Sequence, residues 1–410
     1  MSNWPFRFVH AADFHLERPP FGVTEVPDHL RDLFIEAVYL AAERVFETAV
    51  SQEADFLVLA GDLLDPRWTG PRGLLFLAEQ FRRLAEREIA VYWAGGRVDP
   101  PDAWPSAVRL PDCVHVFPRD RPQEHVHHRD GTPLARVMGV SRAPNRGIRV
   151  SEFDPDPGGL FSIAVVHGSL DAESLSARGI DYWALGGRHG RHTLFSSPHV
   201  GHYPGSPQGR HPEECGPHGC TLVQVDAERT ARTTLAPTDV MRWQSERIAV
   251  EEATTRDHLE RLLHERMQRL VETAPGMDLL VSWTIVGDGP LVAELREGPL
   301  AGQVLQMLRS EYGFGPPAAW SLSLTAEPTA MLPPEWYEQQ TIRGDFLRDL
   351  RHYQMDPTES LELPSYLAEE QVAGTLGAAA DLSDHVTRER VLREAAVLGV
   401  DLLSGEEPEP

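Results

Sequence analysis

Apolar runs typical of β-strands alternate with helix-like stretches over roughly the first 240 residues, and this alternation constrains the fold more than any other feature of the chain. Residues Phe6–Asp13 and Asp55–Asp62 predict two buried strands, each ending in a carboxylate. Between them, Asp28–Ser51 carries apolar residues at helical spacing, and Asp28 is the predicted N-cap. A second helix is expected at about residues 72–87. Strand–helix units of this kind predict an α/β fold.

Shorter strand-like segments follow a third predicted strand at Ile89–Ala94. Strand–helix units first and hairpin-like strands later predict an α/β sandwich, with two facing mixed sheets flanked by helices. The later strands are expected at residues 114–117, 134–140, 161–167, 182–185, 193–195 and 219–226.

The composition changes near Met241, where a second and smaller α/β segment begins. Strands are expected at residues 242–250, 279–286 and 320–324, and helices at 257–272 and 291–312. Pro333-Pro334 then opens a mostly helical region that ends in the acidic segment 405–410. We therefore predict three parts: residues 1–240, a small α/β domain at 241–330, and a helical C-terminal region with an acidic tail at 331–410.

Sequence features also predict where the protein resides. The chain has no run of about 18 apolar residues, as a membrane span would require. Its first residues have neither the basic nor the apolar region of a secretory signal. Three cysteines, an odd number, fit a reducing compartment. We expect a soluble cytoplasmic protein with no membrane partner.

The charge balance bears on partners. Asp and Glu number 62 against 38 basic residues, so the formal net charge is −24, and every basic residue is arginine. Nucleic-acid binders draw most of their affinity from basic side chains that displace counterions from phosphates. The balance therefore disfavours a chain that coats DNA unaided, although a local arginine-lined groove can still act.

Polar residues that suit metal binding stand at the ends of several predicted strands. They are Asp13 and His15, Asp62 and Asp65, His167, and His189. Ligand sites in α/β folds are built at the carboxyl ends of the strands. Carboxylates and imidazoles that converge there are ligands suited to Mn, Fe or Zn.

These residues, in this order, resemble the calcineurin-like metallophosphoesterases, and most closely the branch of SbcD/YhaO-type DNA repair exonucleases. The family pattern D-x-H, G-D-x-x-D, G-N-H-D, H-G and G-H-x-H is matched at its first, second and fourth elements, by Asp13 and His15, Asp62 and Asp65, and His167. Residues 203–211 and 181–186 are similar to two further segments of that branch, Y-P-G-N-P-Q-G-R-H and D-Y-W-A-L-G. The resemblance covers roughly residues 5–235 and implies a four-layer sandwich. It also implies that the small α/β domain at 241–330 corresponds to the family's capping domain.

Two family elements are altered here. An ungapped alignment places G-N-H-D on Gly96-Arg97-Val98-Asp99, so Arg97 replaces a metal-binding Asn and Val98 replaces the catalytic His. In Gly186-Gly187-Arg188-His189, the first His of G-H-x-H is Gly187, and only His189 remains. The residue that would act as catalytic acid is therefore unknown.

The resemblance sorts the ligands by ion. One family ion is held by Asp13, His15, Asp62 and His189, a complete set. The other retains only Asp62 and His167. We expect one divalent ion, Mn in the first place with Fe or Zn as alternatives, and a second ion that is weakly held or absent. Loss of a proton-donating group typically costs 10²–10⁴-fold in rate.

Two arginines replace or flank the lost ligands. Guanidinium groups bind phosphate bidentately, so Arg97 and Arg188 are candidates to bind substrate phosphate where the second ion would be. The alternative is that both side chains point to solvent in a decayed site.

Three functions remain open. The first is a metal-dependent phosphodiesterase, by resemblance a DNA exonuclease, with weakened activity. The second is an inactive family member that acts as a subunit beside a coiled-coil ATPase of the SbcC/YhaN type, with the helices predicted at residues 337–350 and 365–403 as a docking element. The third is a small-molecule phosphoesterase. We favour the first.

A group of histidines lies outside these motifs. His125, His127 and His128 stand beside Asp130-Gly131, a hairpin-turn signal. They predict either a metal-binding strand or a solvated hairpin, and we favour the hairpin.

Overall fold

The computed structural model describes residues 4–23, 25–143, 147–327, 334–355, 361 and 385–404. The chain divides into two compact units. The first comprises Met1–Ile248, Thr254–Ile285 and Glu297–Thr325, and the second comprises Ala249–Ala253, Val286–Arg296 and Ala326–Pro410. The boundaries predicted at residues 240 and 330 stay predictions.

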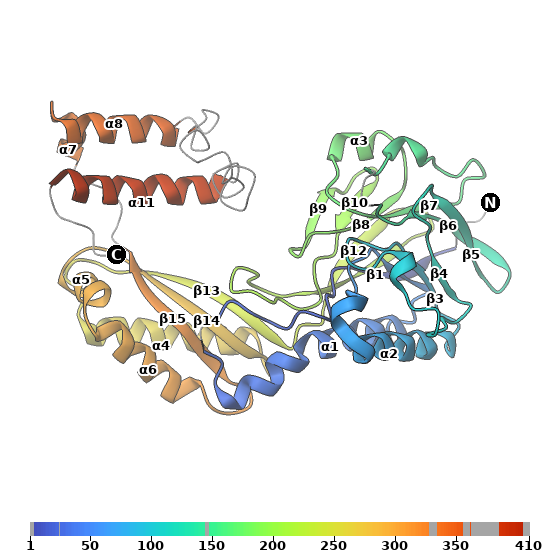
Figure 1. The fold of residues 1–410 in the computed structure, drawn as a ribbon, viewed down its shortest axis with the longest axis horizontal. Coiled ribbons are helices and arrows are strands. Elements are labelled where there is room, and N and C mark those ends of the chain that lie inside the picture. Colours follow the sequence, from blue (N-terminus) through green and yellow to red (C-terminus); the bar gives the residue numbers. More distant parts are fainter. Residues whose placement is uncertain are drawn as a thin grey trace. The chain divides into compact units, whose positions relative to one another are not determined.

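The first unit contains two six-stranded sheets (Figure 1). In one, the strand order is β12-β11-β1-β2-β3-β4. Strands β1 to β4 are parallel, β11 pairs antiparallel with β1, and β12 pairs antiparallel with β11. Their bounds are β1 Phe6–Ala11, β2 Phe56–Leu59, β3 Ala90–Trp93, β4 Val114–Val116, β11 Gly219–Val225 and β12 Ala231–Pro237.

The other sheet has the order β5-β6-β7-β8-β10-β9. Its four central strands are parallel, and β5 and β9 pair antiparallel at the two edges. The bounds are β5 Gln123–Arg129, β6 Thr132–Val140, β7 Phe161–His167, β8 Tyr182–Gly186, β9 His192–Phe195 and β10 Val200–Tyr203.

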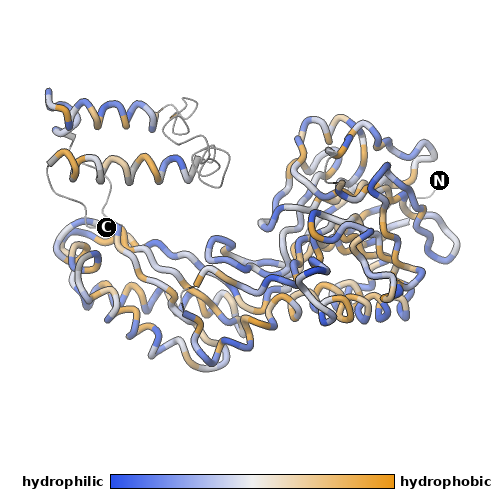
Figure 2. The backbone as a smooth tube through the Cα atoms, viewed as in Figure 1, coloured by the Kyte–Doolittle hydropathy of each residue, from blue (hydrophilic) through white to orange (hydrophobic). Residues whose placement is uncertain are grey.

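Side chains that alternate along the strands build the core between the sheets and the layer under the helices. In β1, Phe8 joins a core that contains residues of both sheets, whereas Val9 packs with α1 (Asp28–Ser51) and α2 (Pro66–Ala85). The short helix α3 (Ala172–Ser176) packs on the other sheet through Leu175. The tubes of α1 and α2 alternate hydrophobic and hydrophilic colour in Figure 2, as helices with one buried face do. The predicted arrangement of two mixed sheets flanked by helices is confirmed.

Two helix starts differ from the prediction. Asp28 is the first residue of α1 rather than its cap, because Pro27 occupies the N-cap position without a side-chain hydrogen bond. Helix α2 begins at Pro66, where the Asp65 carboxylate accepts a hydrogen bond from Arg67 N–H at 3.0 Å. The helix kinks at Gly70, whose φ of 65° only glycine adopts readily. Because the kink interrupts the helical spacing of apolar residues, the sequence predicted only the part of α2 that follows it.

A three-stranded sheet, β13-β14-β15, follows in the chain. Its Leu280 and Trp320 share a hydrophobic cluster with Leu30 and Phe34 of α1. The bounds are β13 Met241–Ala249, β14 Asp278–Val286 and β15 Ala319–Glu327, with helices α4 Arg256–Thr273 and α6 Leu300–Tyr312; two short 3₁₀ helices occur earlier, at Pro101–Ala103 and Val150–Glu152. The three strands and α4 were expected within a few residues. The single helix expected at 291–312 is instead two helices, α5 (Pro290–Glu297) and α6, with Pro299 at the N-cap position of α6. A separate capping domain stays a prediction.

The second unit contains mainly helices, α5 Pro290–Glu297, α7 Pro334–Glu338, α8 Ile342–Met355 and α11 His385–Ser404. Leu347 of α8 packs against Ala396 and Val400 of α11. The remainder of the helix predicted at 365–403, and the acidic tail at 405–410, lie outside the described residues. None of the helices in the described part of the chain has the length and apolar character that crossing a membrane would need.

Candidate metal centre

Backbone hydrogen bonds align the segments that follow β1 and β2. Asp13 N–H donates to Gly61 O at 2.9 Å, and His15 N–H donates to Asp62 O at 3.0 Å. The two parallel strands thus continue as paired loops, which place both motif segments at the same sheet edge. His167, the last residue of β7, joins them from the other sheet through its Nδ1, 2.8 Å from Ala60 O.

The backbone at this edge adopts unusual conformations. Asp13, His15 and Asp62 have φ values of 58°, 47° and 55°. Left-handed conformations at residues other than glycine cost roughly 1–3 kcal/mol each and concentrate at functional sites. The surrounding hydrogen bonds therefore hold these three side chains in a geometry that an unconstrained chain would avoid.

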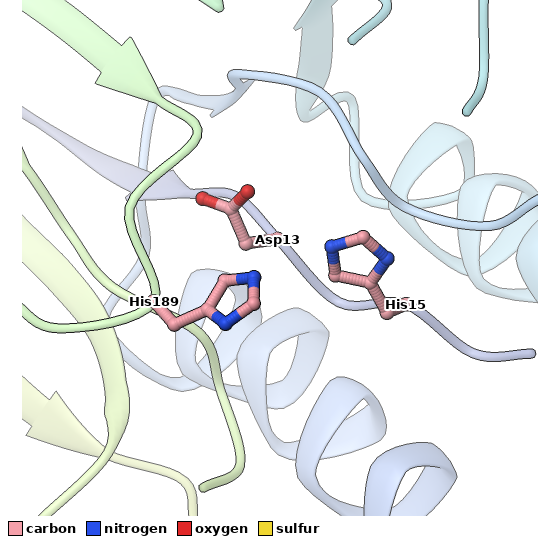
Figure 3. Close-up of side chains that lie close together, drawn as sticks. All are labelled: Asp13, His15 and His189. Carbon is pink, nitrogen blue, oxygen red and sulfur yellow. The ribbon is translucent and has the colours of Figure 1, made fainter. Parts of the chain in front are cut away.

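Five side chains predicted as metal ligands form two groups with one member in common. Asp13, His15 and His189 lie close together in Figure 3 and form the first group, and Asp13, Asp62 and His167 form the second. Within each group, the potential ligand atoms lie within 4.8 Å of one another. Carboxylate oxygen with imidazole nitrogen is a donor set that suits Mn, Fe or Zn, so the residues present fit a divalent ion. The resemblance assigned the shared position to Asp62, whereas Asp13 belongs to both groups here.

Asp13 is fully buried and held by the loop after β8. The N–H of Gly187 donates to its carboxylate, with distances of 2.9 Å to Oδ2 and 3.1 Å to Oδ1. Burial raises the pKa of Asp13, against the opposing effects of His167 and of the Gly187 N–H. Gly187 thus contributes a backbone donor at the position where the family has a histidine.

The two oxygens of Asp62 have different tasks. Oδ1 accepts hydrogen bonds from the N–H groups of Arg97 and Val98, at 2.5 and 3.0 Å. Oδ2 lies 3.3 Å from His167 Nε2 and 3.7 Å from His15 Nε2. Burial opposes ionisation of Asp62, but the hydrogen bond and charge of His167 outweigh it, so the pKa lies well below its usual range. Only Oδ2 is left free to bind an ion.

Each of the three histidines is oriented through its Nδ1. His167 Nδ1 donates to the carbonyl of Ala60, which can only accept. His15 Nδ1 lies 3.1 Å from Glu17 Oε1, and His189 Nδ1 lies 2.7 Å from Glu214 Oε1. Such partners fix the tautomer that leaves Nε2 available as a ligand. Burial lowers the pKa of His167, but its hydrogen bond to Asp62 and that residue's charge raise it to about 9.

Sequence reasoning missed Glu17 and Glu214. Glu17 also accepts the N–H of Asp65 through Oε2 at 3.0 Å, which ties the His15 loop to the start of α2. Glu214 also accepts the N–H of Arg210 at 2.7 Å. Burial opposes ionisation of Glu214, yet the hydrogen bond from His189 lowers its pKa to about 2. For Glu17, the signal in the sequence was its position two residues after His15, which allows its carboxylate to reach the ring.

Asp99 was placed in the altered G-N-H-D element without a role. Its carboxylate accepts hydrogen bonds from the N–H groups of Asp62 at 2.8 Å and Gly96 at 2.6 Å, and also from Leu63 N–H and the Trp93 indole. Burial, together with the charge of Asp62, raises the pKa of Asp99 to about 7. Asp99 therefore fixes the loop at Gly96, and the N–H groups of the next two residues, Arg97 and Val98, bind Asp62. Asp65, by contrast, caps α2 and pairs with Arg67.

A pocket of about 800 Å³ opens onto both groups. Val98 lines it, as do three arginines, Arg18, Arg97 and Arg142. The second predicted phosphate ligand, Arg188, is exposed and its guanidinium lies over the Tyr203 ring, 5.5 Å from the centroid, outside the set of lining residues. The structure therefore brings Arg97 to the predicted ligands and adds two arginines that the sequence did not single out.

Comparisons with known proteins find similarities to a curated relative and to solved structures. No protein-family model matches the chain. A curated relative from Bacillus subtilis (strain 168), described as the uncharacterized metallophosphoesterase YhaO, is 29% identical over 338 residues, which cover 78% of this chain and 81% of the relative. Among solved structures, Vacuolar Protein Sorting 29 from Cryptosporidium parvum shares 16% identity over 57% of this chain and 98% of that protein, with a TM-score of 0.26 that supports no inference.

Proposed function

We propose that the protein is a metallophosphoesterase-family phosphodiesterase that resembles the SbcD/YhaO-type DNA exonucleases. The observation that carries this proposal is the convergence of Asp13, His15, Asp62, His167 and His189 on one arginine-lined pocket. The similarity to a relative described as a metallophosphoesterase supports the same family. By that resemblance, DNA is the proposed substrate.

The proposed ligands of the firmly held ion are Asp13, His15, Asp62 and His189. Asp13, Asp62 and His167 are the proposed ligands of a second, weaker site, with Mn first and Fe or Zn as alternatives. When bound, a divalent ion supplies positive charge that polarises a phosphoryl oxygen and favours the ionised form of a nucleophilic water. The protein's own contribution is to hold both carboxylates and the three Nε2 atoms in place before any substrate arrives.

Two features of the chain support a weakened reaction. Val98 lines the pocket at the position of the family's histidine and carries no proton to give to a leaving oxygen. Asp62 Oδ1 is engaged by two backbone amides, which leaves one oxygen of that carboxylate for the two sites. A missing proton donor alone typically costs 10²–10⁴-fold.

The test is manganese-dependent hydrolysis of bis-p-nitrophenyl phosphate and of single-stranded DNA. We expect slow turnover by the wild type, stopped by chelation and abolished in Asp62→Ala. Asp102→Ala, at an exposed carboxylate outside the pocket, is the control and should leave turnover unchanged. Equal rates in Asp62→Ala and the wild type would overturn the proposal.

One observation favours a second candidate, an inactive family member that serves as a subunit beside a coiled-coil ATPase of the SbcC/YhaN type. It is the presence of Val98 and Arg97 where a catalytic histidine and a ligand are expected. In that case the wild type shows no turnover, and Val98→His combined with Arg97→Asn restores it. Turnover by the wild type would exclude this candidate.

We also propose a cytoplasmic location. Cys113, Cys215 and Cys220 are all free thiols, as a reducing compartment would maintain them. Fractionation of cells that produce the native chain tests this, and a signal in an oxidising compartment would contradict it.

A further inference from the structure

Two of the three arginines in the pocket flank the Asp62 and His167 side of the centre. Arg97 is fixed there by its own N–H, which donates to Asp62 Oδ1 at 2.5 Å. Arg142 follows β6, and its N–H donates to Gly95 O at 2.8 Å, beside the loop that carries Arg97. A Cβ at Gly168, the residue after His167, would lie 4.0 Å from Arg142 Nη1. Both side chains therefore border the weaker group of ligands.

These two guanidiniums differ from other arginines near the site in their partners. Arg67 pairs with Asp65, and Arg18 lies 3.5 Å from Glu17 Oε1. Within the described part of the chain, no carboxylate forms an ion pair with Arg97 or Arg142. In a protein with a net charge of −24, two such side chains lining one pocket form a local site for an anion.

We propose that Arg97 and Arg142 clamp a phosphate group of the substrate other than the one under attack, so that the substrate carries at least two phosphates. This rests on the proposed function, in which the phosphate under attack meets the ion held with His15 and His189. The arginines lie beside Asp62 and Gly168, next to the group of ligands that contains His167. A pocket of about 800 Å³ is of a size that holds a whole small ligand, rather than a single phosphate. Guanidinium, which binds phosphate bidentately and keeps its charge, is suited to the second group.

The test compares two dinucleotides that differ by one phosphate. Calorimetry in manganese measures the binding of pTpT and of TpT, each with a phosphorothioate in place of the phosphate that links the two nucleosides, which slows its hydrolysis. We expect the wild type to bind pTpT at least tenfold more tightly than TpT. The double variant Arg97→Gln/Arg142→Gln should lose this preference. Its binding of manganese, measured separately, should stay close to that of the wild type, because the substitution at position 97 leaves the backbone N–H that donates to Asp62 in place.

A charge-matched double variant, Arg109→Gln/Arg121→Gln, removes two exposed arginines outside the pocket and should keep the preference. Equal loss in both double variants, or no preference in the wild type, would overturn the clamp. A preference that depends on Arg97 and Arg142 in a protein without hydrolytic activity would support the clamp and overturn the proposed hydrolysis. Hydrolysis with no preference for pTpT would overturn the clamp alone.

Discussion

Histidines occupy two contrasting places in the first unit. At the candidate metal centre, each histidine meets a carboxylate or a carbonyl. Burial opposes the charge of His167, but the hydrogen bond that its ring donates to Asp62 raises its pKa to about 9. On β4 and β5, the rings of His115 and His125 pack on each other, and those of His115, His125 and His127 all contact aromatic rings. Burial lowers the pKa of His127 to about 4. We call these three residues the β4–β5 histidine cluster. The same side chain thus gains a positive charge beside Asp62 in one place and is kept neutral by burial in the other, and its neighbours decide which.

Neutralising Asp13 should have the largest effect on the metal centre. Asp13→Asn removes the one carboxylate that belongs to both groups of ligands, while its remaining oxygen still accepts the Gly187 N–H, so the fold is expected to persist. Loss of an outer hydrogen-bond partner costs metal sites roughly 10–100-fold in affinity, and loss of a ligand should exceed this. Calorimetry with manganese should show more than 100-fold weaker binding, with thermal unfolding of the metal-free protein unchanged. Binding that survives intact would mean that Asp13 is not a ligand.

Removing a carboxylate behind a histidine should weaken the centre less. Glu214→Gln takes away the charge that orients His189 through a 2.7 Å hydrogen bond and leaves the second group untouched. We expect manganese to bind the firm site about 10–100-fold more weakly. Glu213→Gln, at the neighbouring exposed carboxylate, is the matched control and should bind as the wild type does. Equal affinities for all three proteins would show that Glu214 does not position His189.

The candidate metal centre also shows how much of a site the sequence alone can predict. The edge on which the ligands gather was predictable. Asp13 and Asp62 closely follow the apolar strands β1 and β2, and His167 ends β7, so all three lie at the carboxyl ends of strands. Glu214 was not predictable, because 25 residues separate it from His189 and only the folded loop brings them together. Arg142 was missed because it is distant in sequence from the predicted ligands, and only the fold brings it to their pocket.

The same lack of long-range information explains why the exposure of His127 was predicted wrongly. The hairpin predicted around Asp130-Gly131 is present as β5 and β6, but His127 is only 8% exposed rather than solvated. Its ring lies 4.7 Å from that of Phe56, and its Nδ1 lies 3.1 Å from the Tyr92 hydroxyl. Both partners belong to the other sheet, so a local pattern of alternating residues carries no information about this contact.

The smallest effect is expected from pH at the β4–β5 histidine cluster. Because burial holds the pKa of His127 at about 4, below its ordinary value of about 6.5, the unfolded chain binds more protons between these two values. Stability should therefore fall as the pH falls through that range, by about 1 kcal/mol from His127 between pH 7 and 5.5.

Asp55 counteracts this effect, whereas His115, His128 and Arg129 reinforce it, and the pKa of His125 is lowered in the same direction by burial. The measurement is urea unfolding in EDTA at pH 7 and 5.5, for the wild type and for His127→Phe, whose ring suits the aromatic surroundings of Phe56 and Tyr92. Since the metal centre titrates identically in both proteins, the difference between their pH dependences isolates His127. A wild type that loses no more stability than His127→Phe on acidification would show that this histidine carries its proton when folded, and the contrast with His167 would disappear.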